Sequence, residues 1–456
     1  MMCFWCRMRM LVCSQTPLVR FLGDGWAGQE FVDVSRLVEG VDFIFSPGGV
    51  TRMVYPLIMR LVENDVLDEG HWLSLNTNGP RQAILGPVRL YFVKLGAEAL
   101  RGYGAAKEEM WKLLHGVQDE RPLSLLELAW TDEYAYYNLY NRVCSETALA
   151  LDRELDFDLF YIHDFQQLPM GEMMGTLKPK LFRWHIPFNE EAIPPEWSGF
   201  LGRYLNAYDA VVVSSKSYME TLLKRGYVGR AFYVYPYIDT SQYGTPTKSD
   251  LQQFADKHGL GEDDGVISIV ARLDPLKGHD RALKALAKVV KTHNVKLLIV
   301  GNGSFSSSKK GLGLSKGEAW RTYLQTLVKN LGLEKHVIFT GHVSQKELEC
   351  VYTLSDFTVL PSVAEGFGLV VVESWLFGKP VVVSKAAGIA ELIVDGVNGY
   401  LVGPDDVSGL ADRMRTLLEN PSLTEEMGKN GRETAKLCSL ERSLEEEKRI
   451  IEEVVG

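Results

Sequence analysis

Short apolar runs alternate with amphipathic stretches along most of the chain, and this alternation predicts strands that alternate with helices. The expected strands of the first half cover residues 10–13, 41–46, 72–76, 159–163, 180–185 and 209–214. Those of the second half cover residues 266–271, 295–300, 336–340, 356–360 and 380–384. The expected helices between these later strands cover residues 280–293, 318–331, 345–354 and 369–377. Strands made almost wholly of Val, Ile and Leu favour parallel sheets covered on both faces.

The repeated strand–helix order predicts a doubly wound α/β fold. A chain of 456 residues is too long for one hydrophobic core, so we expect two Rossmann-like domains that face each other across a cleft. The pattern breaks at residues 237–265, where Gly, Pro, Thr, Ser and charged residues gather, and we place the linker there. The predicted domains are residues 1–240 and 241–435, and a helix at 436–456 is expected to pack back toward the first domain.

Composition narrows the range of partners. Hydrophobic residues make up 46% and charged residues 24% of the chain, and the formal net charge is −10. Since no basic stripe is visible, we expect small-molecule substrates, with neither nucleic acid nor membrane insertion, and homo-oligomer formation stays open. No apolar run approaches the about 18 residues of a membrane span, and the expected location is the cytoplasm. Cys3 and Cys6 have no second pair at zinc spacing, so the six cysteines are expected to be reduced thiols.

Ligands of open α/β sheets bind at the carboxyl ends of the strands, so the residues that follow each strand carry the chemistry. Arg272, Lys277 and Gly278 follow the strand expected at 266–271. A guanidinium and an ammonium can together neutralise a diphosphate in place of a metal ion. On this loop alone, that interpretation and two solvated basic side chains stay equally open.

A glycine-rich loop follows the strand expected at 356–360. It consists of Glu365, Gly366, Phe367, Gly368 and Leu369 and leads to Glu373 in the next helix. The glycines let backbone N–H groups approach a ligand, and the helix N-terminus favours a phosphate. Glu365 and Glu373 can both accept hydrogen bonds from sugar or ribose hydroxyls.

These motifs occur in a combination that resembles the donor domain of retaining GT-B glycosyltransferases. The matching stretches are Arg-x4-Lys-Gly at 272–278, Glu-Gly-Phe-Gly-x4-Glu at 365–373, and residues 388–393 and 395–402. The resemblance implies a nucleotide-sugar donor whose diphosphate is held by Arg272 and Lys277. It places Glu373 on the ribose and Glu365 on the transferred hexose, with the glycine-rich loop lining the donor. It implies no metal and no cofactor besides a co-substrate such as UDP-glucose, ADP-glucose or GDP-glucose.

Short stretches of the first half resemble trehalose-6-phosphate synthases. They are Ser-Pro-Gly-Gly-Val at 46–50, Asp-Glu-Tyr-Ala-Tyr-Tyr-Asn at 132–138, Tyr-Ile-His-Asp-Phe at 161–165, Arg-Trp-His-Ile-Pro-Phe at 183–188 and Tyr-Pro-Tyr-Ile-Asp at 235–239. The resemblance implies that Gly48 and Gly49 meet the donor phosphates and that His185 bonds the donor hexose and the transition state. It implies that the acceptor is bound by Asp164, Tyr136 and Tyr137, and that the first domain is the acceptor side.

The chain departs from that family at three places. Its donor loop reads Gly-Phe-Gly-Leu-Val where trehalose-6-phosphate synthases have Gly-Met-Asn-Leu-Val, and a tryptophan after residues 136–138 is absent. Its first strand is followed by Ser-Gln-Thr at 14–16, so an arginine that would hold an acceptor phosphate is missing there. Arg20, Arg52 and Arg142 are the candidates to replace it.

We therefore expect a metal-independent, retaining enzyme that moves α-glucose from a nucleotide donor to glucose 6-phosphate and forms trehalose 6-phosphate. Free glucose as the acceptor, which would give trehalose, stays an alternative, as does another small polyol or sugar acid. A catalytically silent regulator that binds sugar nucleotides is the alternative of a different class. The expected catalytic residues are Asp164, His185, Arg272, Lys277 and Glu365, and their presence speaks against the silent alternative.

Three further motifs are weaker. Asp156 and Asp158 form a D-x-D that resembles a metal motif, but it opens a strand and we expect no metal there. The glycine-rich stretch at 23–28 resembles a phosphate loop without a preceding strand, so we expect a turn-rich loop on the acceptor side. Residues 301–317 are rich in Gly, Ser and Lys, which predicts a mobile surface loop; a lid over a phosphate, using Lys309 and Lys310, is the alternative.

Overall fold

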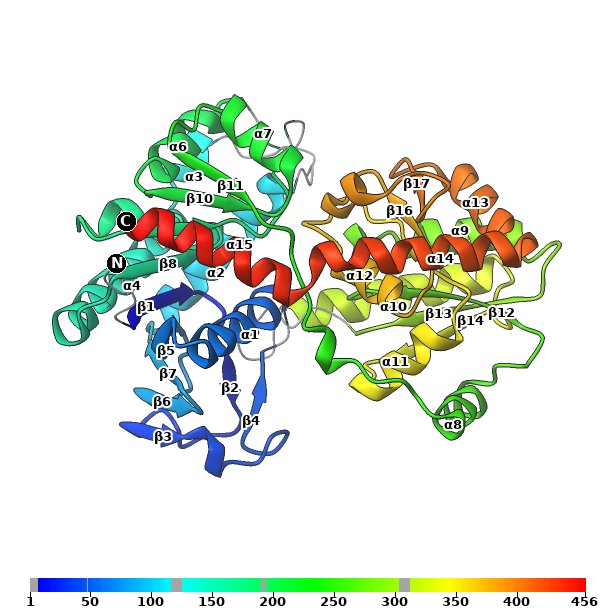
Figure 1. Ribbon diagram of the computed structural model, residues 1–456, viewed down its shortest axis with the longest axis horizontal. Helices are drawn as coiled ribbons and strands as arrows, with labels where there is room; N and C mark the ends of the chain where they lie inside the picture. The colour runs from blue at the N-terminus through cyan, green and yellow to red at the C-terminus, as the bar shows by residue number, and fades with distance from the viewer. Residues whose placement is uncertain are drawn as a thin grey trace, which may run out of the picture. The chain divides into compact units, whose positions relative to one another are not determined.

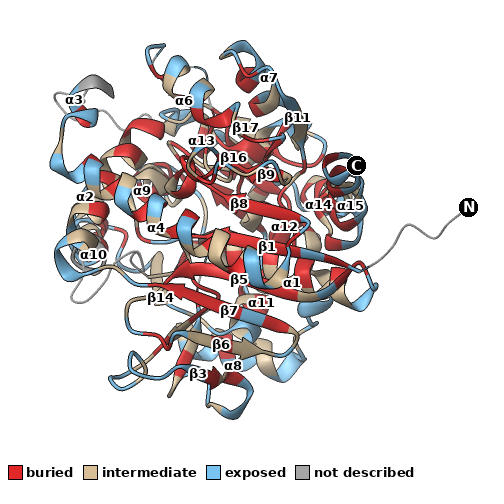
Figure 2. Cartoon of the chain, turned by 90° about the vertical axis from the view of Figure 1, so that its left-hand side faces the viewer, coloured by how far each residue is buried: buried red, intermediate tan, exposed pale blue. Residues whose placement is uncertain are grey.

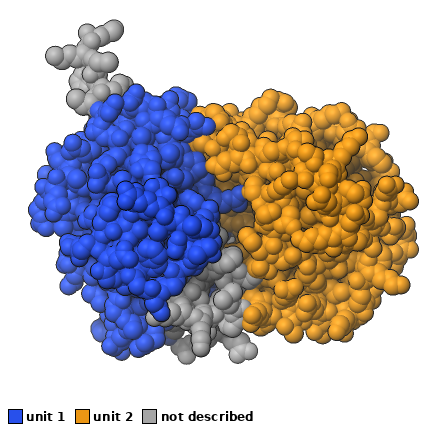
Figure 3. Space-filling view, turned by 90° about the horizontal axis from the view of Figure 1, so that it is seen from below, with its two compact units in different colours: residues 1–235, 443–456 blue, residues 236–442 orange. Residues whose placement is uncertain are grey.

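The chain divides into two compact units, which we describe separately (Figure 3). The computed structural model describes residues 7–46, 48–115, 125–188, 190, 193, 195–302 and 312–456. Unit 1 comprises Met1–Tyr235 together with Ser443–Gly456, and unit 2 comprises Pro236–Arg442. The boundary therefore lies a few residues before 240, and the last 14 residues belong with the first unit. Cys3 and Cys6 lie outside the described residues.

Unit 1 is built on a nine-stranded sheet with the order β11-β10-β9-β8-β1-β5-β7-β6-β3. The strands are β1 (Met8–Ser14), β3 (Phe31–Asp33), β5 (Leu67–Leu75), β6 (Gln82–Leu85), β7 (Val88–Val93), β8 (Leu159–His163), β9 (Lys180–Arg183), β10 (Ala210–Val213) and β11 (Arg230–Tyr233). Neighbours are parallel except β6 and β7, which form an antiparallel pair. Central strands β1 and β8 are buried along almost their whole length, as expected for a sheet covered on both faces (Figure 2).

Helices cover this sheet (Figure 1). They are α1 (Gly49–Glu63), α2 (Ala97–Leu114), α3 (Leu125–Ala129), α4 (Asp132–Leu155), α5 (Met170–Met173), α6 (Trp197–Leu205), α7 (Lys216–Lys224) and most of α15 (Leu440–Val455). Side chains of α2 and α4 share one core cluster with Phe160 and Ile162 of β8. The alternate residues of the strand, Tyr161 and His163, therefore point to the opposite face.

Residues 41–46 differ from the prediction of a buried strand. The strand there, β4 (Phe43–Phe45), pairs antiparallel with β2 (Val19–Phe21) in a separate two-stranded sheet. Phe43 is buried, but Phe45 is 38% exposed. Such a small ribbon covers one face only, so a run that is apolar throughout is not buried throughout.

Unit 2 contains a six-stranded parallel sheet with the order β14-β13-β12-β15-β16-β17. Its strands are β12 (Gly265–Val270), β13 (Val295–Val300), β14 (Val337–Gly341), β15 (Phe357–Leu360), β16 (Val381–Ser384) and β17 (Tyr400–Val402). Its helices are α8 (Lys248–His258), α9 (His279–Val289), α10 (Leu312–Asn330), α11 (Gln345–Leu354), α12 (Leu369–Leu376), α13 (Val407–Glu419) and α14 (Pro421–Ala435). Leu297 of β13 packs with the α9 and α13 side, and its neighbour Leu298 packs with the α8 and α11 side, so both faces are covered.

Short 3-10 helices connect these elements. They are η1 (Val34–Arg36), η2 (Phe165–Gln167), η3 (Thr240–Gln242), η4 (Pro275–Lys277), η5 (Gly388–Leu392) and η6 (Lys436–Cys438). Among the helices of the described residues, none combines the length and the apolar composition that crossing a membrane requires.

Two predicted loops contain helix. Helix α8 lies inside the predicted linker 237–265, because Thr247 and Asp250 form a capping box that starts it. Helix α10 begins at Leu312, so residues 312–317 of the predicted mobile loop are helical. Lys309 and Lys310, proposed for a lid, lie outside the described residues.

Candidate active site

In unit 2, the loops after β12 and β15 are held against each other. The backbone N–H of Val363 donates to the carbonyl of Leu276 at 2.8 Å. Gly278 has a φ of 69°, and a Cβ there would lie 1.9 Å from the carbonyl oxygen of Pro361. Only glycine fits this contact, so the glycine of the Lys-Gly motif brings the two loops together.

This arrangement joins two of the predicted donor residues. Nζ of Lys277 lies 2.6 Å from Oε2 of Glu365, and their side chains are 14% and 17% exposed. Arg272 lies exposed at the start of the first loop. A lysine and a glutamate that neutralise each other in the free protein can separate to meet a diphosphate and a sugar hydroxyl.

The glycine-rich loop after β15 is held in place by backbone hydrogen bonds from the segment that follows β16. Gly368, with a φ of 113°, caps the N-terminus of α12, and Phe367 is buried under the loop. The backbone N–H of Gly388 donates to the carbonyl of Glu365, and that of Ile389 to the carbonyl of Phe367. Gly366 and Leu369 stay partly exposed on the same loop. The backbone of this loop is therefore fixed before a ligand arrives.

Glu373 lies in α12 with only 1% of its surface exposed. Its Oε1 accepts a hydrogen bond from the hydroxyl of Tyr243 at 2.8 Å, and its Oε2 accepts one from the hydroxyl of Tyr352 at 2.6 Å. Each carboxylate oxygen could accept a further hydrogen bond, but at this burial the ribose contact that the resemblance implies requires neighbouring side chains to move.

His279 was missed by the sequence analysis. It is the first residue of α9, directly after the Lys-Gly motif, and it is fully buried. Burial, together with the charge of Lys277, lowers its pKa to about 4, so the imidazole is neutral. A histidine at a helix start beside a cation was the available signal.

In unit 1, Asp164 directly follows β8 and is 7% exposed. Its φ of 69° is unusual for a residue other than glycine. Burial raises the pKa of its carboxyl to about 7, although backbone N–H groups of Phe165, His185 and Ile186 donate to it and act in the opposite direction. This carboxyl can therefore change its charge near neutral pH.

His185 lies beside His163. The two rings are joined at 3.0 Å between Nδ1 of His163 and Nε2 of His185. Burial and the nearby Arg183 hold the pKa of both imidazoles well below the usual value. The structure thus brings the predicted catalytic histidine together with a second, neutral histidine that the sequence analysis had quoted without a role.

The two predicted acceptor tyrosines do not present their hydroxyls to a ligand. Tyr137 is fully buried, and its hydroxyl donates to the carbonyl of Phe165. The hydroxyl of Tyr136 donates to Glu98 at 2.7 Å on the helix surface. Helix periodicity explains the difference, because Tyr137 faces the α2 side of α4 and packs in the core.

The three candidate arginines differ in their surroundings. Nε of Arg20 donates to Oγ of Ser46 at 3.2 Å, and burial lowers the pKa of its guanidinium. Arg52 and Arg142 are exposed, on α1 and α4. Helix α1 begins at Gly49 with Gly48 as its N-cap, so the predicted phosphate-binding glycines lie at a helix N-terminus.

The D-x-D stretch is structural. Asp158 accepts a hydrogen bond from the backbone N–H of Arg9, and Asp156 pairs with Lys178 at 2.6 Å. In the described ranges, no group of three or more His, Cys, Asp or Glu side chains is placed to hold a metal ion.

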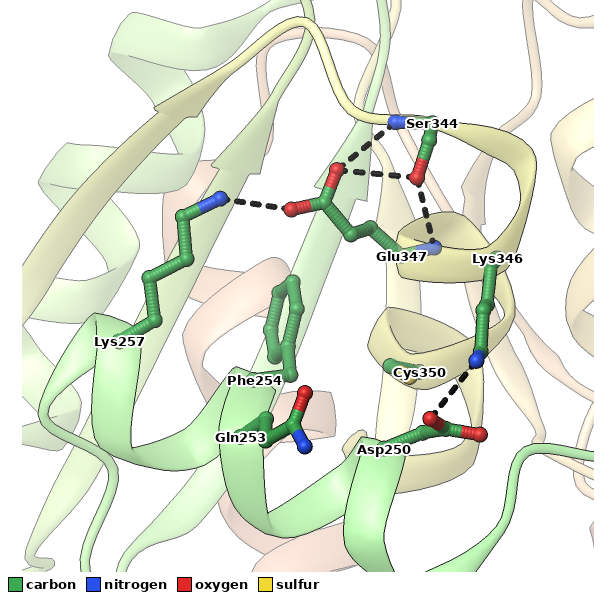
Figure 4. A pocket seen from close by; sticks show the side chains of 8 residues that line it. All are labelled: Asp250, Gln253, Phe254, Lys257, Ser344, Lys346, Glu347 and Cys350. Atoms are coloured by element: carbon green, nitrogen blue, oxygen red, sulfur yellow. Dashed lines mark hydrogen bonds and ion pairs between the residues drawn. The ribbon is translucent and has the colours of Figure 1, made fainter.

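A pocket of about 190 Å³ lies between α8 and α11 of unit 2 (Figure 4). Two ion pairs cross it, Lys257 with Glu347 at 2.6 Å and Lys346 with Asp250 at 2.8 Å, and Phe254 forms part of its wall. None of the predicted site residues lines this pocket, so we do not place the active site there.

Two family models match the chain. Residues 250–434 match the model of glycosyl transferases group 1, and residues 105–220 match the model of the trehalose synthase N-terminal domain. A trehalose synthase of Thermococcus litoralis is 29% identical over 316 residues, which are 68% of this chain and 72% of that protein.

Solved structures share the fold. An α,α-trehalose-phosphate synthase (UDP-forming) from Burkholderia vietnamiensis has a TM-score of 0.74 at 16% identity, over 98% of this chain and 100% of that one. Anabaena HepE in complex with UDP-glucose has a TM-score of 0.65 at 19% identity, over 98% and 100%.

The fold and the group 1 match define the class: the chain is a glycosyltransferase of the GT-B fold, with two Rossmann-like domains. Within that class, the match of residues 105–220 narrows the type. Over these residues the chain is similar to glycosyltransferases of the trehalose-synthase type.

Proposed function

We propose that this enzyme transfers α-glucose from a nucleotide-glucose donor to a glucose acceptor, with retention of configuration and without a metal ion. The observation that carries the proposal is the Lys277–Glu365 pair, held by Gly278 at the carboxyl edge of the unit 2 sheet. Both the cation that a diphosphate needs and the carboxylate that a hexose needs are present within hydrogen-bond distance of each other.

The donor half of the proposal follows from this pair. Arg272 and Lys277 would neutralise the leaving diphosphate, and the N-terminus of α12 would add its partial positive charge. Glu365, released from Lys277, would accept hydrogen bonds from the hexose hydroxyls. The solved HepE complex contains UDP-glucose, which supports a nucleotide-glucose donor for this chain.

The acceptor half rests on unit 1. Asp164 would accept hydrogen bonds from the acceptor hydroxyls. His185 would form a hydrogen bond with the donor hexose and so stabilise the transition state. In this mechanism no side chain acts as a nucleophile, and the leaving diphosphate takes the proton of the acceptor hydroxyl. The role of the protein is to hold fixed charges where charge develops.

Free glucose is our first choice of acceptor. The segment Ser14–Thr16 at the end of β1 offers no cation where the resemblance expects an arginine, and the relative of T. litoralis is a trehalose synthase. Glucose 6-phosphate is the second candidate, because Arg20 is a partly buried cation held by Ser46 at the end of β4. The products would be trehalose and trehalose 6-phosphate.

The test is release of nucleoside diphosphate from UDP-, ADP- and GDP-glucose with each acceptor in turn, with and without a metal chelator. We expect release with glucose, unchanged by the chelator, and an α,α-linked product by NMR. Release with glucose 6-phosphate alone would replace the first candidate by the second, and R20A would then raise KM for the phosphorylated acceptor.

Binding of the donor without turnover in the presence of any of the acceptors would contradict the proposal. It would favour a binding protein without catalytic activity. Loss of activity with the chelator, restored by a divalent cation, would contradict metal independence. A β-linked product would contradict retention.

A further inference from the structure

Three polar side chains, Tyr161, His163 and Arg183, form a row on one face of the unit 1 sheet, beside the buried apolar Val12, Leu181 and Val212. Phe160 and Ile162 of β8 fill the core on one face, so Tyr161 and His163 lie on the other. On the neighbouring strand β9, Arg183 is the register partner of His163. His185 follows two residues later, and its ring centroid lies 5.3 Å from that of His163 with the two ring planes 23° apart.

The C-terminal helix α15 supplies the counter-charge for Arg183 in this row. Glu447 is fully buried and forms an ion pair with Arg183, which is 1% exposed. Its Oε2 also accepts a hydrogen bond from the hydroxyl of Tyr161 at 2.9 Å, and Arg183 donates to the carbonyl of Val234 at 3.1 Å. A buried cation fixed in this way opposes protonation of imidazoles beside it.

The histidine pair therefore shares one hydrogen between facing nitrogens. Both rings are neutral, and Nδ1 of His163 lies 3.0 Å from Nε2 of His185, so one nitrogen donates and the other accepts. Two arrangements are open. Either His163 donates from Nδ1, or His185 donates from Nε2.

The far nitrogen of His163 decides between them. Nε2 of His163 is buried and has no hydrogen-bond partner among the residues that the structure describes. If His185 were the donor, this nitrogen would carry a buried N–H without an acceptor, which is rarer in proteins than a buried acceptor without a donor. The favoured arrangement leaves a lone pair on Nε2 of His163 and the hydrogen on its Nδ1.

We propose that His163 is a positioning residue that donates its Nδ1 hydrogen to Nε2 of His185. This bond fixes His185 in the Nδ1–H form, so the partly exposed ring of His185 offers a hydrogen-bond donor and not a lone pair. The inference rests on the proposed function in one respect, namely that His185 faces the transferred hexose. A donor there bonds a hexose oxygen and stabilises the transition state, and it cannot serve as a general base.

The direct test is long-range nitrogen–proton NMR of the full chain with ¹⁵N-labelled histidine. Signals are assigned from spectra of the H163N and H185N variants. We expect His185 to show a protonated Nδ1 and an unprotonated Nε2. The opposite pattern, an N–H at Nε2 of His185, would overturn the inference whether or not the protein turns over a substrate.

The kinetic test uses a matched pair of variants. The amide of H163N can still donate from about the position of Nδ1, whereas H163L cannot donate. We expect kcat to fall about 10–100-fold in H163L with KM for the donor nearly unchanged, and to recover most of its value in H163N. H293L, which removes a partly exposed histidine of unit 2, should leave kcat unaltered.

The outcomes separate the two proposals. Equal loss of kcat in H163N and H163L, with unchanged melting temperatures, would overturn the role of the donated hydrogen. Absence of turnover in the unmodified enzyme would overturn the proposed function, and the NMR pattern of His185 would still decide the hydrogen position.

Discussion

Lys277 and Glu365 at the edge of the unit 2 sheet are 14% and 17% exposed and neutralise each other, whereas the charged groups at the edge of the unit 1 sheet are almost completely buried. In unit 2 the partners come from loops that follow two adjacent strands. In unit 1 Arg183 depends on Glu447, more than 260 positions later in the chain. The comparison teaches that the first edge can exchange its ion pair for a ligand, while loss of one partner at the second edge leaves an uncompensated buried charge.

The largest expected effect breaks the buried pair. E447Q leaves Arg183 buried without its carboxylate, and we expect the free energy of unfolding to fall by about 3–5 kcal/mol. Denaturant unfolding followed by tryptophan fluorescence measures it. The control E433Q removes the exposed partner of Lys436 and should cost less than about 1 kcal/mol. Equal costs in the two variants would contradict a special cost of unpairing the buried Arg183.

A companion variant sharpens this result. R183M/E447M removes both charges and fills the space with apolar side chains of similar length. Replacing a buried ion pair in this way is often neutral, so most of the lost stability should return.

The next effect is a pH dependence in unit 1. The pKa of Asp164 is about 7 in the folded protein against 3.8 as its ordinary value, so the folded chain holds a proton that the unfolded chain releases. Its contribution to stability therefore decreases as pH rises from about 4 to about 7, by up to about 4 kcal/mol. D164N lacks this titration, so the stability difference between the two proteins should follow that curve.

The stability difference between wild type and D164N is the quantity to measure, because other groups titrate in the same pH range. His163 and His185 have lowered pKa values and act in the opposite direction, since the unfolded chain binds their protons first. They are present in both proteins. A stability difference between wild type and D164N that is flat from pH 4 to pH 7 would contradict the raised pKa of Asp164.

The exchangeable pair of unit 2 predicts a loss of activity without a loss of fold. K277A should lower kcat/KM for the nucleotide-glucose by about 2–4 kcal/mol of transition-state stabilisation, because a charge-assisted contact to the diphosphate is lost. The control K284A removes a lysine of α9 that pairs with Asp280. Near-normal turnover in K277A would remove Lys277 from the donor site.

The smallest expected effect concerns the two tyrosine hydroxyls that bond the carboxylate of Glu373. Y243F removes one of the two hydroxyls that bond its carboxylate, which should lower stability by about 1.5 kcal/mol. If the ribose displaces the Tyr243 hydroxyl from this carboxylate, Y243F should also bind nucleoside diphosphate more tightly, as calorimetry would show. Y352F is the matched variant for the second hydroxyl.

The fold followed from the sequence where strands are buried on both faces. The bounds 159–163 and 345–354 coincide with β8 and α11, because an apolar run and a capping box mark their ends. The loops of unit 2 were also predictable. Gly278 and Gly368 both have a positive φ, which favours glycine, and both belong to the motifs of the sequence. The prediction of a buried strand at 41–46 was wrong, because composition does not show which faces a short ribbon covers.

The sequence could not show that Arg183 and Glu447 of unit 1 form an ion pair. Glu447 stands among three consecutive glutamates, and its position three residues after Leu444 and three before Ile450 places it on the apolar side of α15. That signal predicts a buried carboxylate. It does not tell that the partner is Arg183, because strands and helices distant in the sequence meet only in the fold.

The division of unit 1 into two pieces of sequence has a consequence for the order of events during synthesis. Residues 1–235 leave the ribosome first, but Glu447 follows only after the 207 residues of Pro236–Arg442. At ordinary translation speeds this interval is about 10–40 s. During that time the nascent first unit carries Arg183 without its counter-ion, so unit 2, continuous in sequence, can complete its core before the unit that precedes it.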